Sequence, residues 1–273
     1  MRFKEGLRYF VAFFLIFEFA FAGAWTRKAG NVLVVPYYYF YSAEKYYDLN
    51  WKKRAIDNGG YFEGQGFGIY FEYGFTDNLN FIGNVPFILN KWMDDYTYKD
   101  NYGFGDVEVG LKFKFYDSKV VFTLQTSIIV PVYSVDREPL LGYRQYAGEI
   151  RFLFSGGMRP FGLNSYFNIE TGFRKFYSKV ASQVRFQFLY GIYFNSLTQG
   201  LIQFDGVNSI GKGTFATRFN PSIETDYIEG KLSLSLAYRF TYKAWLQAGF
   251  FYDVYGKKIG VGRGFFIASW IEI

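Results

Sequence analysis

The stretch Gly105–Gln125, which reads GDVEVGLKFKFYDSKVVFTLQ, decides the fold class of this sequence. Its first half sets charged residues against apolar ones: Asp106, Glu108, Lys112 and Lys114 alternate with Val107, Val109, Leu111, Phe113 and Phe115. After Asp117-Ser118 the alternation resumes. A period of two residues predicts two β-strands, each with one apolar and one polar face, joined by a tight turn. The open question is which of the two faces meets water.

Alternation of this kind recurs from Asn31 to the C-terminus, without a convincing helical period. We therefore expect an all-β chain. The predicted strands are 31–42, 62–75, 79–90, 104–116, 119–132, 146–158, 165–176, 183–194, 198–206, 227–240, 244–255 and 264–273. Most of them reach the roughly 9–11 residues that a tilted membrane-spanning strand needs.

The connections between these strands fall into two classes that alternate along the chain. The short ones are 76–78, 117–118, 160–164, 195–197 and 241–243, and the others are 43–61, 91–103, 133–145, 177–182, 207–226 and 256–263. Tight turns at one end and longer loops at the other are typical of bacterial outer-membrane barrels. Thr214–Glu224 alternates well enough to be another strand, which makes fourteen strands the alternative to twelve. Phe71–Gly83 and Leu236–Gly249 share a Phe-Thr turn between two strands, and reading both as periplasmic turns favours twelve.

The volume of a barrel interior indicates which face is wet. A soluble barrel would have to enclose nearly all the Phe, Leu and Ile side chains of these strands, and a small barrel interior has limited volume. The opposite arrangement places large apolar residues against lipid and small or polar residues inside. In the strand 62–75, Gly64, Gly66, Gly68 and Gly74 share one face, opposite Phe67, Ile69, Phe71, Tyr73 and Phe75. The sequence therefore predicts a transmembrane antiparallel up-and-down β-barrel.

The aromatic content fits a membrane barrel. Aromatic residues make up 24% of the chain, with 35 Phe and 26 Tyr. Rings near strand ends are expected to form the two interfacial girdles of a membrane barrel. The predicted girdle residues are Tyr37 to Tyr41, Tyr73, Phe75, Phe115, Tyr116, Phe176, Tyr177, Tyr238 and Phe240.

Two missing residue types limit the chemistry. The chain has no cysteine, which excludes disulfides and thiolate metal sites, and no histidine, the usual base of enzymatic membrane barrels. We expect no enzyme, no cofactor and no metal site; Asp94, Asp95 and Asp100 read as a solvated loop rather than a calcium site. The Lys and Arg residues are scattered, so nucleic acid is not an expected partner.

The N-terminus reads as an export signal. Arg2, Lys4 and Arg8 precede a short apolar run, and Ala20-Phe21-Ala22 offers a cleavage point. We expect residues 1–22 to be a cleaved signal peptide and 23–273 to be one barrel domain in the outer membrane, with both termini periplasmic. Only about eight residues then precede the first strand, so no plug domain is expected, and the loops 43–61 or 133–145 are the candidates for an inward constriction.

Four stretches carry a family resemblance: AWTRKAG, YFEYGFTDNLNFIGNVPF, YGFGDVEVGLKFKFY and the closing ASWIEI. They resemble outer-membrane barrels grouped as transporters of the phenol meta-degradation pathway type, and similar barrels. One departure is that the chain ends in Ile273, where such barrels commonly end in an aromatic residue read by the barrel-assembly machinery. The resemblance implies a transporter-like barrel of about twelve strands in the outer membrane and implies no particular solute.

The polar faces supply the candidate functional residues. The predicted lumen-lining residues are Glu72, Asp106, Glu108, Lys112, Lys114, Glu149, Arg151, Glu170, Arg174, Arg185, Glu229, Lys231 and Arg239. Two functions fit this mixed set. One is a narrow passive channel or transporter in which acidic and basic rows orient a small polar or amphipathic solute. The other is a sealed scaffold whose charges neutralise one another.

A second basic group is expected outside the lumen. Lys257, Lys258 and Arg263 lie in the predicted loop 256–263, which belongs to the long-loop end. They form a candidate outer-rim site for lipopolysaccharide phosphates, alongside the simpler interpretation that they keep the loop soluble.

Overall fold

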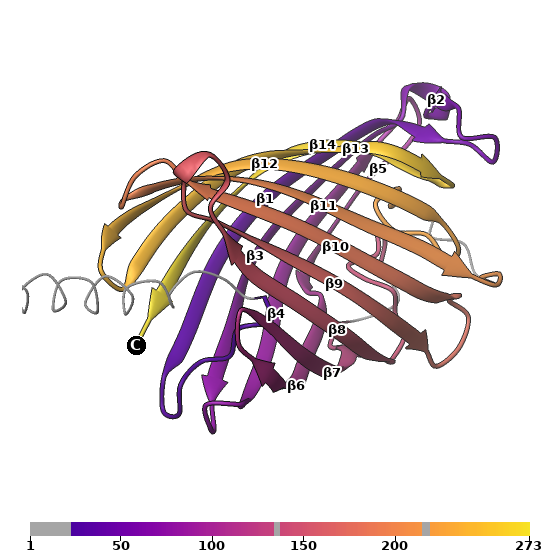
Figure 1. Cartoon of the computed structure of the whole chain (residues 1–273). Coiled ribbons are helices and arrows are strands. Elements are labelled where there is room, and N and C mark those ends of the chain that lie inside the picture. The colour runs from indigo at the N-terminus through magenta and orange to yellow at the C-terminus, as the bar shows by residue number, and fades with distance from the viewer. Residues whose placement is uncertain (1–22, 134–136, 215–218) are drawn as a thin grey trace, which may run out of the picture.

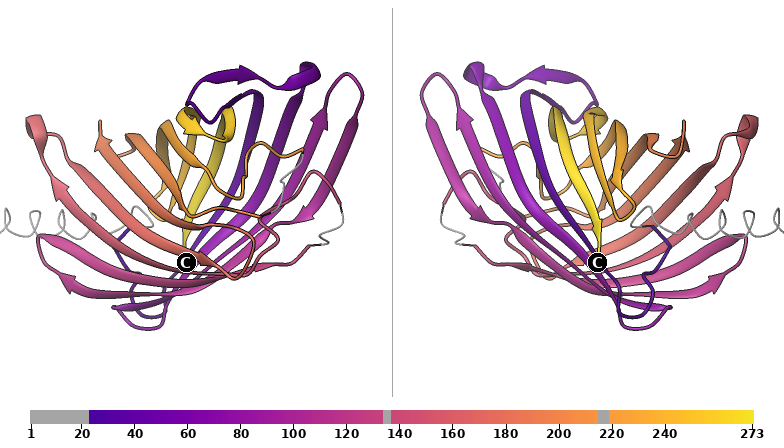
Figure 2. Two further views of the ribbon diagram at one scale, coloured as in Figure 1. Left: turned by 90° about the vertical axis from the view of Figure 1, so that its right-hand side faces the viewer. Right: turned by 90° about the vertical axis from the view of Figure 1, so that its left-hand side faces the viewer.

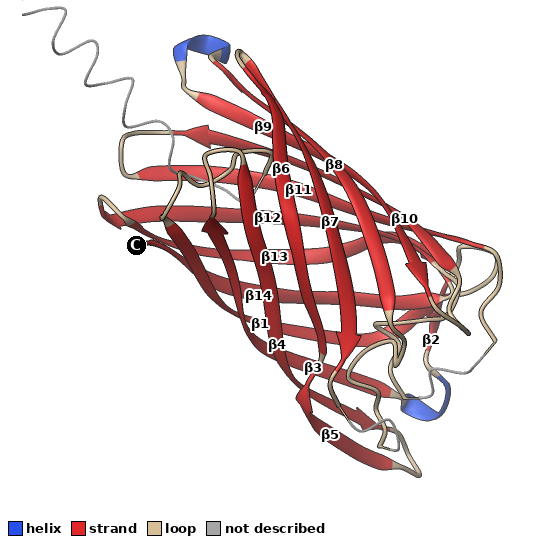
Figure 3. Ribbon diagram, turned by 90° about the horizontal axis from the view of Figure 1, so that it is seen from below, coloured by secondary structure: helices blue, strands red, loops and turns tan. Residues whose placement is uncertain are grey.

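The structure is a computed structural model that describes residues 23–133, 137–214 and 219–273, mostly as β-strands (Figure 3). The predicted signal peptide, residues 1–22, lies outside the described residues. The strands are β1 (Val32–Tyr47), β2 (Lys53–Ala55), β3 (Tyr61–Gly74), β4 (Leu79–Met93), β5 (Tyr98–Phe104), β6 (Asp106–Asp117), β7 (Val120–Pro131), β8 (Ala147–Met158), β9 (Ser165–Phe176), β10 (Ser182–Tyr193), β11 (Thr198–Ile210), β12 (Ile228–Thr241), β13 (Ala244–Lys257) and β14 (Ile259–Glu272). Two single-turn 3₁₀ helices, η1 (Asp57–Gly59) and η2 (Pro160–Gly162), lie in connections. No helix among the described residues is long and apolar enough to cross a membrane.

Twelve long strands form one closed antiparallel barrel. Each pairs with its sequence neighbour, from β1–β3 through β13–β14, and β14 pairs back with β1. The closing register runs from Leu33 opposite Glu272 to Tyr47 opposite Ile259. Figure 2 shows the same closure, with the indigo β1 beside the yellow β14, and Figure 1 shows the tilt of the strands. The predicted twelve-stranded barrel is confirmed, and the described residues of 214–224 lie in a loop.

The extra strands extend one end of the barrel. We call this the loop end, and the end with the connections 75–78, 118–119, 159–164, 194–197 and 242–243 the turn end. The predicted loop 91–103 is wrong: it is the β4–β5 hairpin with a turn at 94–97. β5 and β6 follow one another along β4 and are interrupted beside Pro86, which has no N–H to donate to the ladder. The predicted loop 256–263 is also wrong, because only Lys258 separates β13 from β14.

The exposure of the side chains agrees with the prediction made from the limited volume of a barrel interior. On the outside, Leu111 and Phe113 of β6 are about half exposed, and Phe250 of β13 is 73% exposed. On the inside, Lys112 is 1% exposed although it lies between those two apolar residues in sequence. The opening stretch thus sends its Leu and Phe side chains to the lipid side and its lysine into the barrel.

Part of the predicted aromatic girdle faces the other way. Tyr37 and Tyr39 lie in the barrel over the glycines of β3: a Cβ added at Gly68 would come within 2.3 Å of the Tyr37 ring, and one at Gly66 within 2.1 Å of the Tyr39 ring. Phe176 is also buried inside, at 2% exposure. These inward glycines therefore make room for specific tyrosines, where the sequence indicated only a general relief of crowding.

Candidate functional site

The barrel interior contains a buried cluster around Glu72 of β3. The Lys112 ammonium lies 2.9 Å from one carboxylate oxygen of Glu72, and the Tyr70 hydroxyl donates to the same oxygen at 2.6 Å. Arg27, which precedes the first strand, places its Nε 3.5 Å from the other oxygen and its Nη1 2.5 Å from Glu272 of β14. Glu72 is fully buried, so these cations offset the cost of removing its charge from water.

A second cluster crosses β6 to β9 as a ladder of alternating charges. Arg151 donates to Glu149 on its own strand at 2.5 Å and to Glu170 on β9 at 2.7 Å. Arg174 stands opposite Glu149 in the β8–β9 register and donates to it at 2.5 Å, while its second nitrogen lies 3.6 Å from Glu108. Each arginine thus bridges two carboxylates, which is the geometry its forked guanidinium favours.

A third cluster lies on β12 and β13. Lys231 is 3.3 Å from Glu229 and 3.8 Å from Asp253, and Asp253 is fully buried. The backbone N–H of Gly262 donates to Asp253 at 2.7 Å, and Tyr41 lies 3.5 Å from the same oxygen. This group joins β12 and β13 to β14 and β1 through side chains as well as through the sheet.

The remaining predicted lumen residues are placed at the edges of these clusters. Arg185 lies 3.9 Å from Glu149 at the end of the arginine ladder. Asp106 accepts the backbone N–H of Tyr143 at 2.9 Å, and it therefore holds the loop 133–145 rather than an open lumen wall. Lys114 and Arg239 lie at the turn end, where Lys114 pairs with Asp117 at 2.6 Å and Arg239 packs over the Trp245 ring.

The predicted outer-rim basic group does not form one loop. Lys257 ends β13, Lys258 occupies the single connecting position and contacts Asp226, and Arg263 belongs to β14. The Arg263 guanidinium is exposed and lies 3.4 Å from Glu44. The structure keeps all three residues toward the loop end but places them on different local surfaces.

Three cavities follow one another inward from the turn end. The first has a volume of about 890 Å³ and the second about 240 Å³, and both are lined by Glu272. The third, of about 210 Å³, shares Tyr70 and Gln187 with the second, and its wall includes Glu108, Lys112, Arg151 and Glu170. The Glu72 cluster and the arginine ladder therefore border a row of neighbouring spaces that reaches the middle of the barrel.

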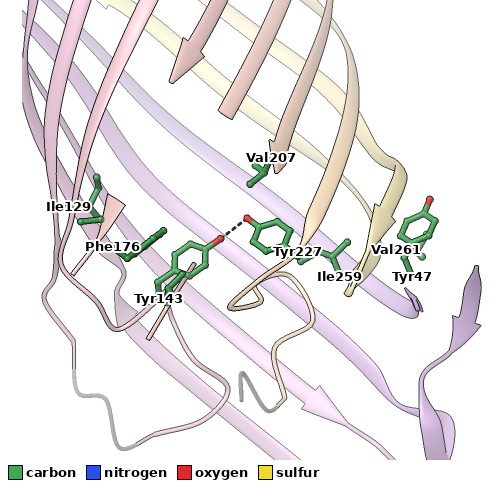
Figure 4. Close-up of a cluster of buried hydrophobic side chains, with 10 residues drawn as sticks. Tyr47, Ile129, Tyr143, Phe176, Val207, Tyr227, Ile259 and Val261 are labelled. Carbon is green, nitrogen blue, oxygen red and sulfur yellow. Dashed lines mark hydrogen bonds between the residues drawn. The ribbon is translucent and has the colours of Figure 1, made fainter. Parts of the chain in front are cut away.

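Loops cover the loop end of this row. Tyr143, from the connection between β7 and β8, and Tyr227, just before β12, join their hydroxyls at 2.6 Å (Figure 4). They belong to a buried apolar cluster completed by Tyr47, Ile129, Ala147, Phe176, Val180, Val207, Ile259 and Val261. Burial raises the pKa of the Tyr227 hydroxyl well above its ordinary value, so this hydroxyl stays protonated. The expectation that 133–145 folds inward agrees with its buried Leu140. In the other candidate loop, 43–61, β2 is exposed.

The segment 23–31 covers part of the turn end. The backbone N–H of Ala24 donates to Ser155 of β8 at 2.9 Å, and Thr123 of β7 donates to the carbonyl of Ala24. Trp25 packs edge-on against Tyr166 of β9, with ring centroids 6.1 Å apart. No plug domain was expected, yet Gly23, Ala24 and Arg27 are buried in the barrel; we call residues 23–31 the strap.

Sequence reasoning missed several interior residues. Asp205 lies on the same face of its strand as Gln203, and Asp253 lies on the same face as Gln247. The two-residue alternation, applied to every strand, would therefore have found both. Arg27 lies outside every strand and gave no periodic signal. The described residues contain no group of three or more acidic side chains placed to hold a metal ion.

Known proteins resemble this chain in fold only. No family model matches the sequence, and no curated protein matches it. The COG4313 outer membrane channel from Pseudomonas putida F1 superposes with a TM-score of 0.73 at 13% identity, covering 93% of this chain and 99% of that one. The chain shares the fold of that protein. The β domain of the Bordetella autotransporter BrkA gives a TM-score of 0.55 at 10% identity, covering 88% of this chain and 99% of that one. The sequence resemblance to outer-membrane barrels is thus confirmed for the fold.

Proposed function

We propose that this protein is an outer-membrane channel that passes small polar or amphipathic solutes through a narrow lumen of mixed charge and catalyses no reaction. The observation that carries the proposal is the row of three cavities bordered by the Glu72 cluster and the arginine ladder. Separated acidic and basic groups along a constricted path select solutes by charge and orientation. Cavities of this size admit only small molecules.

The orientation follows the usual arrangement of such barrels. Short turns face the periplasm and longer loops face outward, so the turn end and both chain termini are assigned to the periplasm. The outer rim would then bring Lys257, Lys258 and Arg263 toward lipopolysaccharide phosphates, and the exposed guanidinium of Arg263 supports that contact. The assembly machinery that inserts outer-membrane barrels is a further expected partner.

A sealed structural barrel is the second candidate, because one observation favours it. The interior charges are extensively paired: Glu149 alone contacts Arg151, Arg174 and Arg185. Paired charges present little net field to a solute, and loops and the strap cover both ends. In this reading the networks hold the barrel together and nothing passes.

Current through a planar bilayer separates the two candidates. Purified protein is reconstituted and unitary conductance is recorded under a salt gradient; a sealed barrel gives no resolvable unitary current. For the channel, we expect Glu108→Gln to shift the reversal potential toward anion selectivity, because Glu108 borders the innermost cavity. Arg174 keeps its 2.5 Å contact with Glu149, so this change strands no buried charge. Glu44→Gln is the matched control, since it removes the same charge from an exposed position at the outer rim. An equal shift from both variants would contradict a lumen path past Glu108.

A further inference from the structure

We propose that the second and third cavities together form a binding site for one neutral, polyhydroxylated solute, such as a monosaccharide. This inference rests on the proposed channel function and names the class of solute that the lumen takes. The two cavities have volumes of about 240 Å³ and 210 Å³ and share Tyr70 and Gln187 in their walls. Each is smaller than the roughly 300–1,000 Å³ of a site for a drug-sized ligand, so the solute is small.

Carboxamide side chains gather in the walls of these two cavities. The third cavity is lined by Asn84, Gln125 and Gln187, and the second by Gln187, Gln203 and Gln247. A carboxamide has N–H donors and an acceptor oxygen, and a sugar hydroxyl likewise donates and accepts hydrogen bonds. Amides therefore match hydroxyl groups without requiring a charge on the solute.

Gln125 is buried without a side-chain partner. It is 8% exposed, and in the register of the sheet it stands between Lys112 of β6 and Arg151 of β8. Its side-chain amide forms no hydrogen bond with any described residue and borders the third cavity. Buried polar groups are rarely left unpaired, and a solute hydroxyl in this cavity would supply the missing bond.

The neighbouring amides are held in place by the wall and keep part of their hydrogen-bonding capacity. Asn84 accepts the Tyr37 hydroxyl at 2.9 Å, which leaves its own N–H groups for a solute. Gln187 and Gln203 donate to Asp205 at 2.7 and 2.9 Å, and their carbonyl oxygens accept no hydrogen bond from the described residues. Groups fixed before the solute arrives lose less conformational freedom on binding.

Two indole rings offer a surface for the apolar face of the solute. Trp245 and Trp270 stand directly opposite each other in the β13–β14 register, and both line the second cavity together with Gln247. The face of an aromatic ring is negative, so it attracts the polarised C–H groups on one face of a sugar ring. A pyranose can therefore pack against an indole while the hydroxyls around its edge reach the amides.

The charges of the site favour a solute that carries no net charge. Two acidic and two basic side chains line the third cavity, and one of each lines the second. Lys112 already pairs with Glu72 at 2.9 Å, and Arg151 with Glu170 at 2.7 Å. A charged solute would compete with these pairs and leave one partner without its counter-charge. A neutral polyol adds hydrogen bonds and leaves the pairs intact.

Tryptophan fluorescence of the purified barrel measures binding without relying on conduction, because Trp245 and Trp270 line the site. D-Glucose is the probe, and gluconate and glucosamine are charged compounds of nearly the same size. We expect saturable binding of glucose and binding of both charged compounds that is weaker by about tenfold or more, which corresponds to about 1.4 kcal/mol. Equal affinity for the three compounds overturns the site.

The unpaired amide is tested directly by Gln125→Met, which keeps most of the volume and removes the hydrogen-bonding groups. It should weaken glucose binding by about tenfold. Gln65→Met is the matched control and should bind glucose like the parent, because Gln65 lies on the same outward face of β3 as the exposed Phe67.

Gln187→Met is the second variant in case Gln125→Met fails to fold, since Asp205 then keeps Gln203, and it should weaken glucose binding by a similar factor. Unchanged glucose affinity in the folded variants overturns the site. Swelling of proteoliposomes in glucose separates the site from the channel. Saturable binding without swelling supports the site and contradicts the channel, whereas swelling without saturable binding overturns the site and leaves the channel intact.

Discussion

Replacing Lys112 tests whether the buried Glu72 cluster stabilises the barrel as a coupled unit. Lys112 is 1% exposed and Glu72 is fully buried, with 2.9 Å between them. Breaking such a pair from one side costs about 3–5 kcal/mol, because the remaining charge is left buried. In Lys112→Met, Glu72 keeps the Tyr70 hydroxyl at 2.6 Å and Arg27 at 3.5 Å, so we expect a loss near the lower limit, about 3 kcal/mol.

The matched control lies two residues along the same face of β6. Lys114→Met removes the same charge and much the same volume, but the partner Asp117 is half exposed, so the expected loss is about 0–1 kcal/mol. The measurement is equilibrium unfolding by urea or guanidinium of protein refolded in lipid vesicles, followed by tryptophan fluorescence.

A double-mutant cycle completes this test. Glu72→Leu with Lys112→Met replaces the pair by apolar groups and should lose less than the sum of the single changes, because neither charge is then left unpaired. The reasoning is refuted if Lys112→Met and Lys114→Met cost the same. It is refuted equally if the two changes in the cycle are additive.

Three further predictions concern other parts of the wall. Phe250→Arg, at the most exposed phenylalanine in the middle of β13, should cost about 2–4 kcal/mol in lipid vesicles, and a near-zero cost there would contradict the lipid-facing assignment. Gly66→Ala should cost about 1–3 kcal/mol, because the new Cβ would lie 2.1 Å from the Tyr39 ring; Gly66→Ala combined with Tyr39→Ala should recover part of the loss. Tyr143→Phe should cost about 1–3 kcal/mol by leaving the buried Tyr227 hydroxyl without this partner, and a stability equal to that of the parent would show that water replaces the bond.

The strands could be predicted from the sequence because their cause is local. Successive residues of a strand point to opposite faces, so the face of a residue depends only on whether its position is odd or even. Because lipid lies outside and polar groups lie inside, this alternation is visible in β6, where charged residues alternate with Leu and Phe. The prediction of the aromatic girdle was partly wrong because it ignored the side chains of the neighbouring strand. Tyr37 and Tyr39 are aromatic like the lipid face but have the inward parity, and Gly68 and Gly66 of β3 leave the space that holds them.

The candidate site was only partly predictable because its pairs form across strands. Parity placed Glu149 and Arg174 on polar faces, but only the register of β8 with β9 sets them opposite each other. Contacts of Arg27 with Glu72 and Glu272 depend on a segment that has no strand neighbours at all. The composition gave no sign that this segment folds inward.

The strand number itself explains why such segments are needed. Side chains fill the interior of a barrel of about 8 strands, and about 16 strands enclose an open aqueous channel. Twelve strands leave more interior than their own side chains fill, yet less than an unobstructed pore requires. This barrel fills the difference with Leu140 and Tyr143 at one end and Ala24 and Trp25 at the other. Because Ala24, Leu140 and Tyr143 are hydrogen-bonded to side chains of the wall and not to its strand ladders, the contacts that close the lumen are separate from the backbone pairs that hold the wall. In the proposed channel, these fillers can therefore move without breaking a strand pair.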